Sequence, residues 1–160
     1  MAQVYIGLGS NLENPQLQVE QAFTELSSIS ASQLISCSPL YSSRAVGPGD
    51  QPDYVNAVAL LHTDLSPIEL LDALQGIEQS HRRVRLEHWG PRTLDLDVLL
   101  FEDQIIDSER LQVPHPYLTQ RNFVIYPLND ISPALILPSG TRLSDLAANC
   151  PIDGLKRLQS

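Results

Sequence analysis

The spacing of apolar residues along the chain predicts strands and helices in a definite order. Short apolar runs at 3–8, 33–41 and 54–62 are typical of strands. Between the first two runs lies a helical pattern, for which Asn14 is a suitable cap and Pro15 a suitable first residue. The apolar positions that recur at helical spacing in this segment are Val19, Ala22, Phe23, Leu26 and Ile29.

A second helical pattern follows the third strand. Ser66 and Glu69 form a capping box around Pro67, and an apolar stripe then continues to about Ser80. A fourth strand follows in the run TLDLDVLLF, which ends at Phe101. The order strand, helix, strand, strand, helix, strand predicts an α+β fold with a ferredoxin-like β-α-β-β-α-β core, an antiparallel sheet and helices on one face.

The chain after the fourth strand is expected to form shorter elements. The pattern predicts a hairpin partner at 104–107, a further strand at 123–128 and a short helix at 143–148. Several prolines in this part favour turns over long elements. No repeat, linker or low-complexity segment is visible, so residues 1–160 are predicted to form a single domain.

The composition narrows the classes of function. With 42% hydrophobic and 18% charged residues, the chain is typical of soluble globular proteins. Its net charge of −9 argues against a nucleic-acid partner held by a general basic surface. Lys156 is the only lysine, and the arginine preference favours specific anion recognition, although genome composition can also produce it.

The cysteines and the apolar segments indicate in which cellular compartment the protein is expected. Cys37 and Cys150 are isolated and lack metal-binding spacing, which fits a reducing compartment. The N-terminus lacks the basic segment of a signal peptide, and no stretch approaches the ~18 apolar residues of a membrane span. We expect a cytoplasmic protein without a membrane partner. No oligomerisation stripe is visible, so a monomer is expected.

The candidate chemistry is concentrated between Arg82 and Phe101. Successive side chains of a strand point to opposite faces, so Asp95 and Asp97 share a face, roughly 6.5 Å apart at the backbone. Two such carboxylates can hold one or two hard divalent ions. The preceding arginines match phosphate oxygens, and the pattern favours a magnesium and triphosphate site. The alternative is a half-buried strand that follows a solvated basic loop.

Two segments contain pairs of glycines. The loop 42–53 holds two glycines and two prolines and is too long for a simple hairpin, so it is either a functional loop or a surface excursion. Gly7 and Gly9 begin a dinucleotide-like motif but lack its third glycine, and a tight turn is predicted. The chain has neither a phosphate loop nor the protein-kinase signatures, so any use of ATP lies outside those two classes.

The chain resembles the 6-hydroxymethyl-7,8-dihydropterin pyrophosphokinases of folate biosynthesis along nearly its whole length. The strongest match is Arg83-x-Arg85 followed by Trp89-Gly90-Pro91-Arg92-Thr93-Leu94-Asp95-Leu96-Asp97. The other matching motifs, in chain order, are Gly9-Ser10-Asn11, Gly47-Pro48 with Gln51-Pro52-x-Tyr54-x-Asn56, Val113-Pro114-His115-Pro116 and Arg121-x-Phe123. The resemblance implies a ferredoxin-like fold and transfer of the pyrophosphoryl group of ATP to the pterin hydroxymethyl oxygen, with release of AMP.

The resemblance also implies roles at the phosphate end of a site. Asp95 and Asp97 would ligate two Mg²⁺ ions, and Arg83, Arg85 and Arg92 would clamp the phosphates, which makes these five the expected catalytic residues. The expected ATP-binding residues are Gln75, Glu78, Arg83, Arg85, Trp89, Arg92, Arg110, His115 and Arg121. A solvated helix face is the alternative for Gln75 and Glu78, and a surface loop is the alternative for His115.

A pterin pocket is the other implied feature. Tyr54 and Phe123 would sandwich the ring, and Asn56 would recognise its polar edge, although residue type alone makes the two aromatics core residues. The full expected pterin set is Ser43 and Val46 through backbone groups, Tyr54, Asn56, Trp89, Asp95 and Phe123. The loops 43–53 and 82–92 would act as lids that exclude water.

The chain departs from the family pattern at two places. His88 stands where an arginine often precedes the tryptophan, which removes a fixed charge, and Ser43-Arg44 replaces a common Thr-Pro. Two other functions stay open from the residues. One is a non-catalytic ferredoxin-like module that binds a metabolite. The other is a metal-dependent nucleotidyl or phosphodiester enzyme, which would share Asp95 and Asp97 but lack the pterin sandwich.

Overall fold

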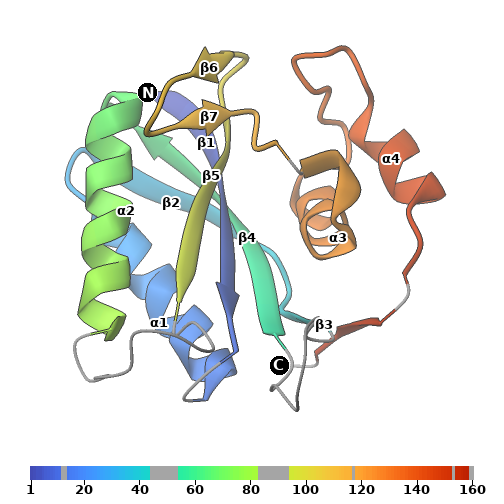
Figure 1. Cartoon of the computed structure of the whole chain (residues 1–160), viewed down its shortest axis with the longest axis horizontal. Helices are drawn as coiled ribbons and strands as arrows, with labels where there is room; N and C mark the ends of the chain where they lie inside the picture. Colours follow the sequence, from blue (N-terminus) through green and yellow to red (C-terminus); the bar gives the residue numbers. More distant parts are fainter. Residues whose placement is uncertain (12–13, 44–53, 83–93, 117, 153, 159–160) are drawn as a thin grey trace.

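A six-stranded antiparallel sheet runs through the middle of the molecule, with helices on both faces (Figure 1). The computed structural model describes residues 1–11, 14–43, 54–82, 94–116, 118–152 and 154–158. The strand order is β5-β1-β4-β3-β8, and β2 also pairs with β4. The strands are β1 (Ala2–Ser10), β2 (Ser32–Cys37), β3 (Tyr41–Ser43), β4 (Tyr54–Thr63), β5 (Asp95–Phe101) and β8 (Leu155–Arg157).

Helices α1 (Pro15–Ser27) and α2 (Pro67–Arg82) cover the first face of the sheet (Figure 1). The predicted capping box is present, because the Glu69 N–H donates to Ser66 Oγ at 3.2 Å and the Ser66 N–H donates to Glu69 Oε1 at 2.9 Å. Asn14 occupies the cap position of α1 but makes no side-chain cap bond, since its backbone is left-handed (φ 60°) where a capping side chain needs an extended one.

The first apolar core lies between these helices and one side of the strands. Leu94, Leu96 and Val98 are buried there, as expected from the alternation of the fourth strand. Val19 and Leu70 of the two helices belong to the same cluster. The predicted β-α-β-β-α-β core is therefore confirmed, and it leaves Asp95 and Asp97 on the opposite side of β5.

Helices α3 (Asn122–Ile131) and α4 (Leu143–Asn149) cover the second face, and α3 corrects one prediction. Residues 123–128 form part of α3 and are not a strand, whereas the two helices of the predicted core lie on one face as expected. The run was ambiguous because a short apolar segment reads equally well as a buried helix. In the structure Val124, Ile125 and Leu128 lie at helical spacing against Tyr5 and other residues of this face.

The remaining elements differ from prediction in detail. The expected strand 33–41 is two strands, because Ser38 leaves the regular ladder and bonds Val58 twice: its N–H donates to the Val58 carbonyl (2.8 Å) and its Oγ accepts from the Val58 N–H (2.9 Å). The hairpin predicted near 104–107 is present as β6 (Ile106–Asp107) paired with β7 (Gln112–Val113). Strand β8 had not been predicted.

The described residues include a 3₁₀ helix at Leu118–Gln120 but no helix long and apolar enough to cross a membrane.

Candidate active site

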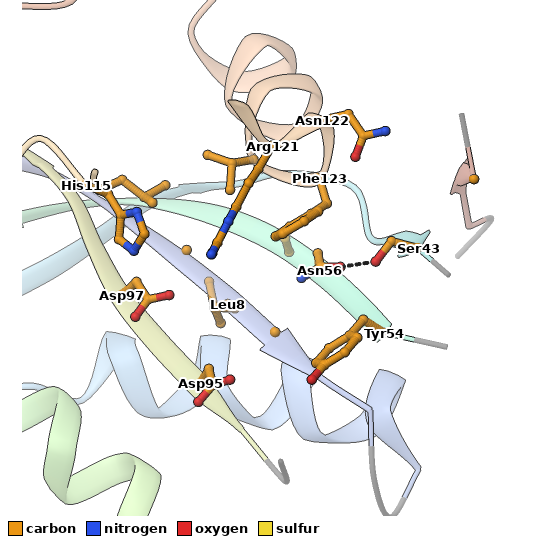
Figure 2. Close-up of a pocket in the computed structure, with 16 residues that line it drawn as sticks. Leu8, Ser43, Tyr54, Asn56, Asp95, Asp97, His115, Arg121, Asn122 and Phe123 are labelled. Atoms are coloured by element: carbon orange, nitrogen blue, oxygen red, sulfur yellow. Dashed lines mark hydrogen bonds between the residues drawn. The ribbon is translucent and has the colours of Figure 1, made fainter. Parts of the chain in front are cut away.

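A pocket of about 710 Å³ opens between the second face of the sheet and the start of α3 (Figure 2). The predicted site residues that it brings together lie up to 80 positions apart in the sequence, on three strands, in loop segments and on a helix. The predicted residues that line it are Ser43, Tyr54, Asn56, Asp95, Asp97, His115, Arg121 and Phe123.

Asp95 and Asp97 form the acidic side of the pocket. Their strand pairs with β1 so that Asp95 lies opposite Gly9 and Asp97 opposite Gly7. Asp95 is half-buried and Asp97 is exposed. Carboxylate oxygens are suitable ligands for Mg²⁺, and the described residues contain no group of three or more His, Cys, Asp or Glu placed to hold a metal. Among the described residues, Asp95 and Asp97 are therefore the two carboxylates of the pocket that could bind such an ion.

His115 and Arg121 lie across from the carboxylates. The His115 N–H donates to the Leu99 carbonyl (3.0 Å), which fixes this loop to β5. Burial lowers the pKa of His115, Asp97 opposes this shift, and Arg121 adds to it, so the imidazole is neutral at neutral pH. Arg121 extends from the start of α3 into the pocket (Figure 2), with its guanidinium carbon 5.5 Å from the Phe123 ring centroid.

The other end of the pocket combines aromatic rings with a fixed amide. Tyr54 and Phe123 lie on either side of Asn56 in Figure 2. Asn56 is only 6% exposed, and its Oδ1 accepts a hydrogen bond of 2.8 Å from the Ser43 hydroxyl. This bond orients the amide and leaves its NH₂ group to donate elsewhere. Ser43 had been expected to contribute backbone groups, and nothing in the sequence indicates its side-chain bond.

Two glycines form the floor of the pocket. Gly7 and Gly9 lie within β1, so the tight turn predicted there is wrong. A Cβ at Gly9 would lie 3.0 Å from Asn56 Nδ2, and one at Gly7 would lie 3.2 Å from Leu99 Cδ2. The absence of side chains at these positions thus keeps space beside Asn56 and Leu99.

Three predicted nucleotide residues lie outside this pocket, on and near α2. Arg110 donates to Asp72 Oδ1 at 2.6 Å and to Gln75 Oε1 at 3.2 Å. Glu78 Oε2 accepts from the Leu96 N–H at 2.8 Å, so it caps the start of β5. Gln75 is exposed and Glu78 half-buried. These contacts connect α2 to β5 and to the segment before β7.

Other predicted residues lie outside the described part of the chain. They are Val46, Arg83, Arg85, Trp89 and Arg92, together with His88 and most of the two expected lids.

Several lining residues were not predicted from the sequence, among them Asn122 and Gly154. Asn122 stands between Arg121 and Phe123 and donates from Nδ2 to the Pro151 carbonyl at 3.1 Å. Its place between two motif residues was a usable signal. Gly154 precedes β8 and also lines the pocket, but no sequence pattern pointed to it.

Comparison with known proteins gives consistent matches. Residues 5–133 match the family model described as 7,8-dihydro-6-hydroxymethylpterin-pyrophosphokinase. The chain is 51% identical over 155 residues to the 2-amino-4-hydroxy-6-hydroxymethyldihydropteridine pyrophosphokinase of Pseudomonas aeruginosa, covering 97% of this chain and 96% of that protein. It is 49% identical over 146 residues to the enzyme of the same name from Haemophilus influenzae, with 91% of each covered.

A solved structure shares the fold. The wild-type HPPK-DHPS of Plasmodium falciparum superposes with a TM-score of 0.76 at 13% identity, covering 100% of this chain and 48% of that one. The chain therefore spans about half the length of the Plasmodium protein, and this likeness bears on the fold alone.

Proposed function

The chain belongs to the 7,8-dihydro-6-hydroxymethylpterin-pyrophosphokinase family, and from this membership we propose that the pocket beside Asp95 and Asp97 is its active site. The enzyme transfers the pyrophosphoryl group of ATP to the hydroxymethyl oxygen of 6-hydroxymethyl-7,8-dihydropterin in folate biosynthesis, giving AMP and the pterin diphosphate. One observation carries the site: a single cavity is lined by paired carboxylates, a guanidinium, and an amide between two aromatic rings. A non-catalytic module has no need of the carboxylates.

The acceptor is assigned to the end with Tyr54, Asn56 and Phe123. The rings offer flat apolar surfaces to a flat heteroaromatic molecule, and the Asn56 amide offers donors to its polar edge. The hydrogen bond from Ser43 holds this amide in one orientation before the ligand arrives. The proposed pterin set also includes Asp95 and, outside the described residues, Val46 and Trp89.

The phosphates are assigned to the side with Asp95 and Asp97. We propose that this pair holds two Mg²⁺ ions together with ATP. When bound, the ions would neutralise the charge that develops on the transferring group. Arg121 and His115 face this space, where a guanidinium can pair with phosphate and a neutral imidazole can hydrogen-bond to it.

The remaining ATP contacts are proposed on the α2 side. Gln75, Glu78 and Arg110 would border the nucleotide, and since Arg110 is already bonded to Asp72 and Gln75, binding there would exchange those contacts. Arg83, Arg85, Arg92 and Trp89, outside the described residues, complete the proposed set. In this assignment Arg83, Arg85 and Arg92 clamp the phosphates during attack.

The chain is further proposed to be a single domain over residues 1–160, a monomer and cytoplasmic. The free thiols of Cys37 and Cys150 support the location, since reduced cysteines are usual in the cytoplasm.

The test is to incubate the protein with ATP, Mg²⁺ and 6-hydroxymethyl-7,8-dihydropterin and to identify the nucleotide formed. We expect AMP in step with pterin diphosphate. Asn56→Ala should weaken pterin binding about 10-fold or more, because it removes a buried hydrogen-bonding group, while ATP affinity stays within about twofold. ADP as the product would overturn the reaction, and an unchanged pterin affinity in Asn56→Ala would overturn the pocket assignment.

A further inference from the structure

Strand β8 completes the pocket at the end assigned to the pterin, and we propose that it is a positioning element for that end of the site. The proposal rests on the proposed function, because it concerns how the same pocket binds its acceptor. Strand β8 pairs with β3, and Leu155 lies opposite Ser43. Gly154, just before β8, lines the pocket in a left-handed conformation (φ 73°) that favours glycine.

Three side chains, Arg157, Tyr41 and Asp130, connect β8 to β3 and α3, and we call this cluster the lock. Arg157 of β8 donates to Asp130 Oδ1 of α3 at 2.8 Å, and its guanidinium carbon lies 5.8 Å from the ring centroid of Tyr41 on β3. The Tyr41 hydroxyl donates to the other oxygen of Asp130. Burial first, and then the bond to Asp130, raises the pKa of Tyr41, so the hydroxyl remains a donor over the neutral range. One carboxylate thus joins three elements.

Each of these three elements gives a residue to the same end of the pocket. They are Ser43 from β3, Phe123 from α3 and Gly154 from the residue before β8. Asp95 and Asp97 lie on β5, at the other edge of the sheet from β8. A disturbance of the lock therefore acts on the pterin end and leaves the carboxylate side in place.

The link to recognition passes through Ser43. Strand β3 has only three residues, held by β4 on one side and β8 on the other. The Ser43 hydroxyl orients the Asn56 amide, and both residues are buried. If β8 loosens, β3 loses one of its two partners and Ser43 no longer holds the amide, so pterin binding weakens.

The backbone on either side of β8 supports this placement. Tyr126 of α3 donates from its hydroxyl to the Cys150 carbonyl at 2.6 Å, and Asn122 donates to the Pro151 carbonyl at 3.1 Å. The Leu158 N–H donates to the Leu40 carbonyl at 2.8 Å, directly before β3. Strand β8 is therefore fixed at both ends to the elements that line the pterin end.

The test compares Arg157→Met with Lys156→Met. Both replace an exposed cation of β8, but adjacent strand residues point to opposite faces, and the structure assigns only Arg157 to the lock. We expect Arg157→Met to raise the pterin Kd about 3- to 10-fold, the range for one lost hydrogen bond, with the ATP Kd within about twofold. Tyr41→Phe, which removes only the hydroxyl, should act in the same direction. Arg157→Lys should restore part of the affinity.

Binding of pterin and of ATP would be measured separately by calorimetry, alongside thermal unfolding. A pterin Kd for Arg157→Met and Tyr41→Phe equal to that of Lys156→Met would overturn the proposal. An equal loss of affinity for pterin and for ATP would also overturn the proposal, because it would mean that β8 stabilises the whole protein and does not act on the pterin end. Failure of the proposed function would look different, as a wild-type protein that forms no AMP from ATP and pterin.

Discussion

Replacing Gly9 by alanine tests the geometry of the pocket with the smallest possible change. The new Cβ would lie 3.0 Å from Asn56 Nδ2, whereas atoms in ordinary packing contact lie about 3.5–4.0 Å apart. Asn56 must therefore move by a few tenths of an ångström. It cannot do so freely, because Oδ1 is held by the Ser43 hydroxyl at 2.8 Å.

The magnitude follows from these two contacts. Overpacking a tight site costs about 1–3 kcal/mol, and the strained bond to Ser43 is worth about 0.5–1.5 kcal/mol. Alanine also restricts the unfolded chain more than glycine does, which stabilises the folded protein by about 0.4–1 kcal/mol. We expect a net loss of about 0.5–4 kcal/mol in unfolding free energy. Since the displaced amide is the one proposed to contact the acceptor, the pterin Kd should rise about 10-fold, equivalent to about 1.4 kcal/mol.

Gly7→Ala is the matched control on the same strand and face. Its Cβ would meet the buried, apolar Leu99 side chain at 3.2–3.5 Å and would not touch Asn56. Gly76→Ala in α2 has no atom within 4 Å of its Cβ and should raise stability by about 1 kcal/mol. The assay is pterin calorimetry with urea unfolding of all three variants. An equal pterin Kd for Gly9→Ala and Gly7→Ala would refute the reasoning.

Three further changes test the carboxylates, the α2 cap and the contact between α1 and α2. Asp97→Asn removes a charge from the proposed ion site and should lower kcat at least about 100-fold in an AMP-formation assay. The backbone and side-chain bonds from Ser66 lower the pKa of Glu69, so the wild-type protein should lose stability as Glu69 is protonated below pH 4.5. Glu69→Gln has no carboxylate at this position and should lose less stability over the same range. The stability from this shift is present above pH 4.5 and is lost as pH falls through the lowered pKa, which melting curves at pH 6 and pH 3.5 would detect. His81→Ala should lower the unfolding free energy by about 1–3 kcal/mol, because its buried ring bonds Gln18 and Glu25 of α1.

Two of these changes have a control within the chain. Asp103→Asn changes an exposed aspartate just past β5 and should leave kcat within about twofold. His62→Ala should not reproduce the loss at His81, since His62 Nε2 has no hydrogen-bond partner among the described residues. Similar effects in a variant and its control would contradict the corresponding prediction.

The parts of the fold that were predicted correctly have strong local signals. The capping box at Ser66 fixed the start of α2, and the alternation at Asp95 and Asp97 fixed both the strand and the face of the carboxylates. Both signals arise within a few neighbouring residues. They therefore need no knowledge of what packs against them.

The incorrect predictions occur where tertiary contacts determine the secondary structure. Residues 123–128 became a helix because Tyr5 and the rest of the second face offered a surface on which Val124 and Leu128 could be buried together. Strand β8 is three residues long and takes its conformation from pairing with β3. The bond from Ser43 to Asn56 likewise depends on the β3–β4 pairing. These features depend on contacts between residues that are far apart in the sequence, so no local sequence pattern predicts them.

The sheet with a separate apolar core on each face has a consequence for how the protein opens. Strand β4 contributes to both cores, Ala59 to one and Val58 to the other, so its amide hydrogens should exchange with solvent only on global unfolding. The layer of α3 and α4 packs on one core alone, so we expect it to detach at lower free energy. Because α3 carries Phe123, such partial opening would dismantle the proposed acceptor site while α1, α2 and the sheet stay folded. Activity should then disappear at a lower urea concentration than the far-ultraviolet circular dichroism signal.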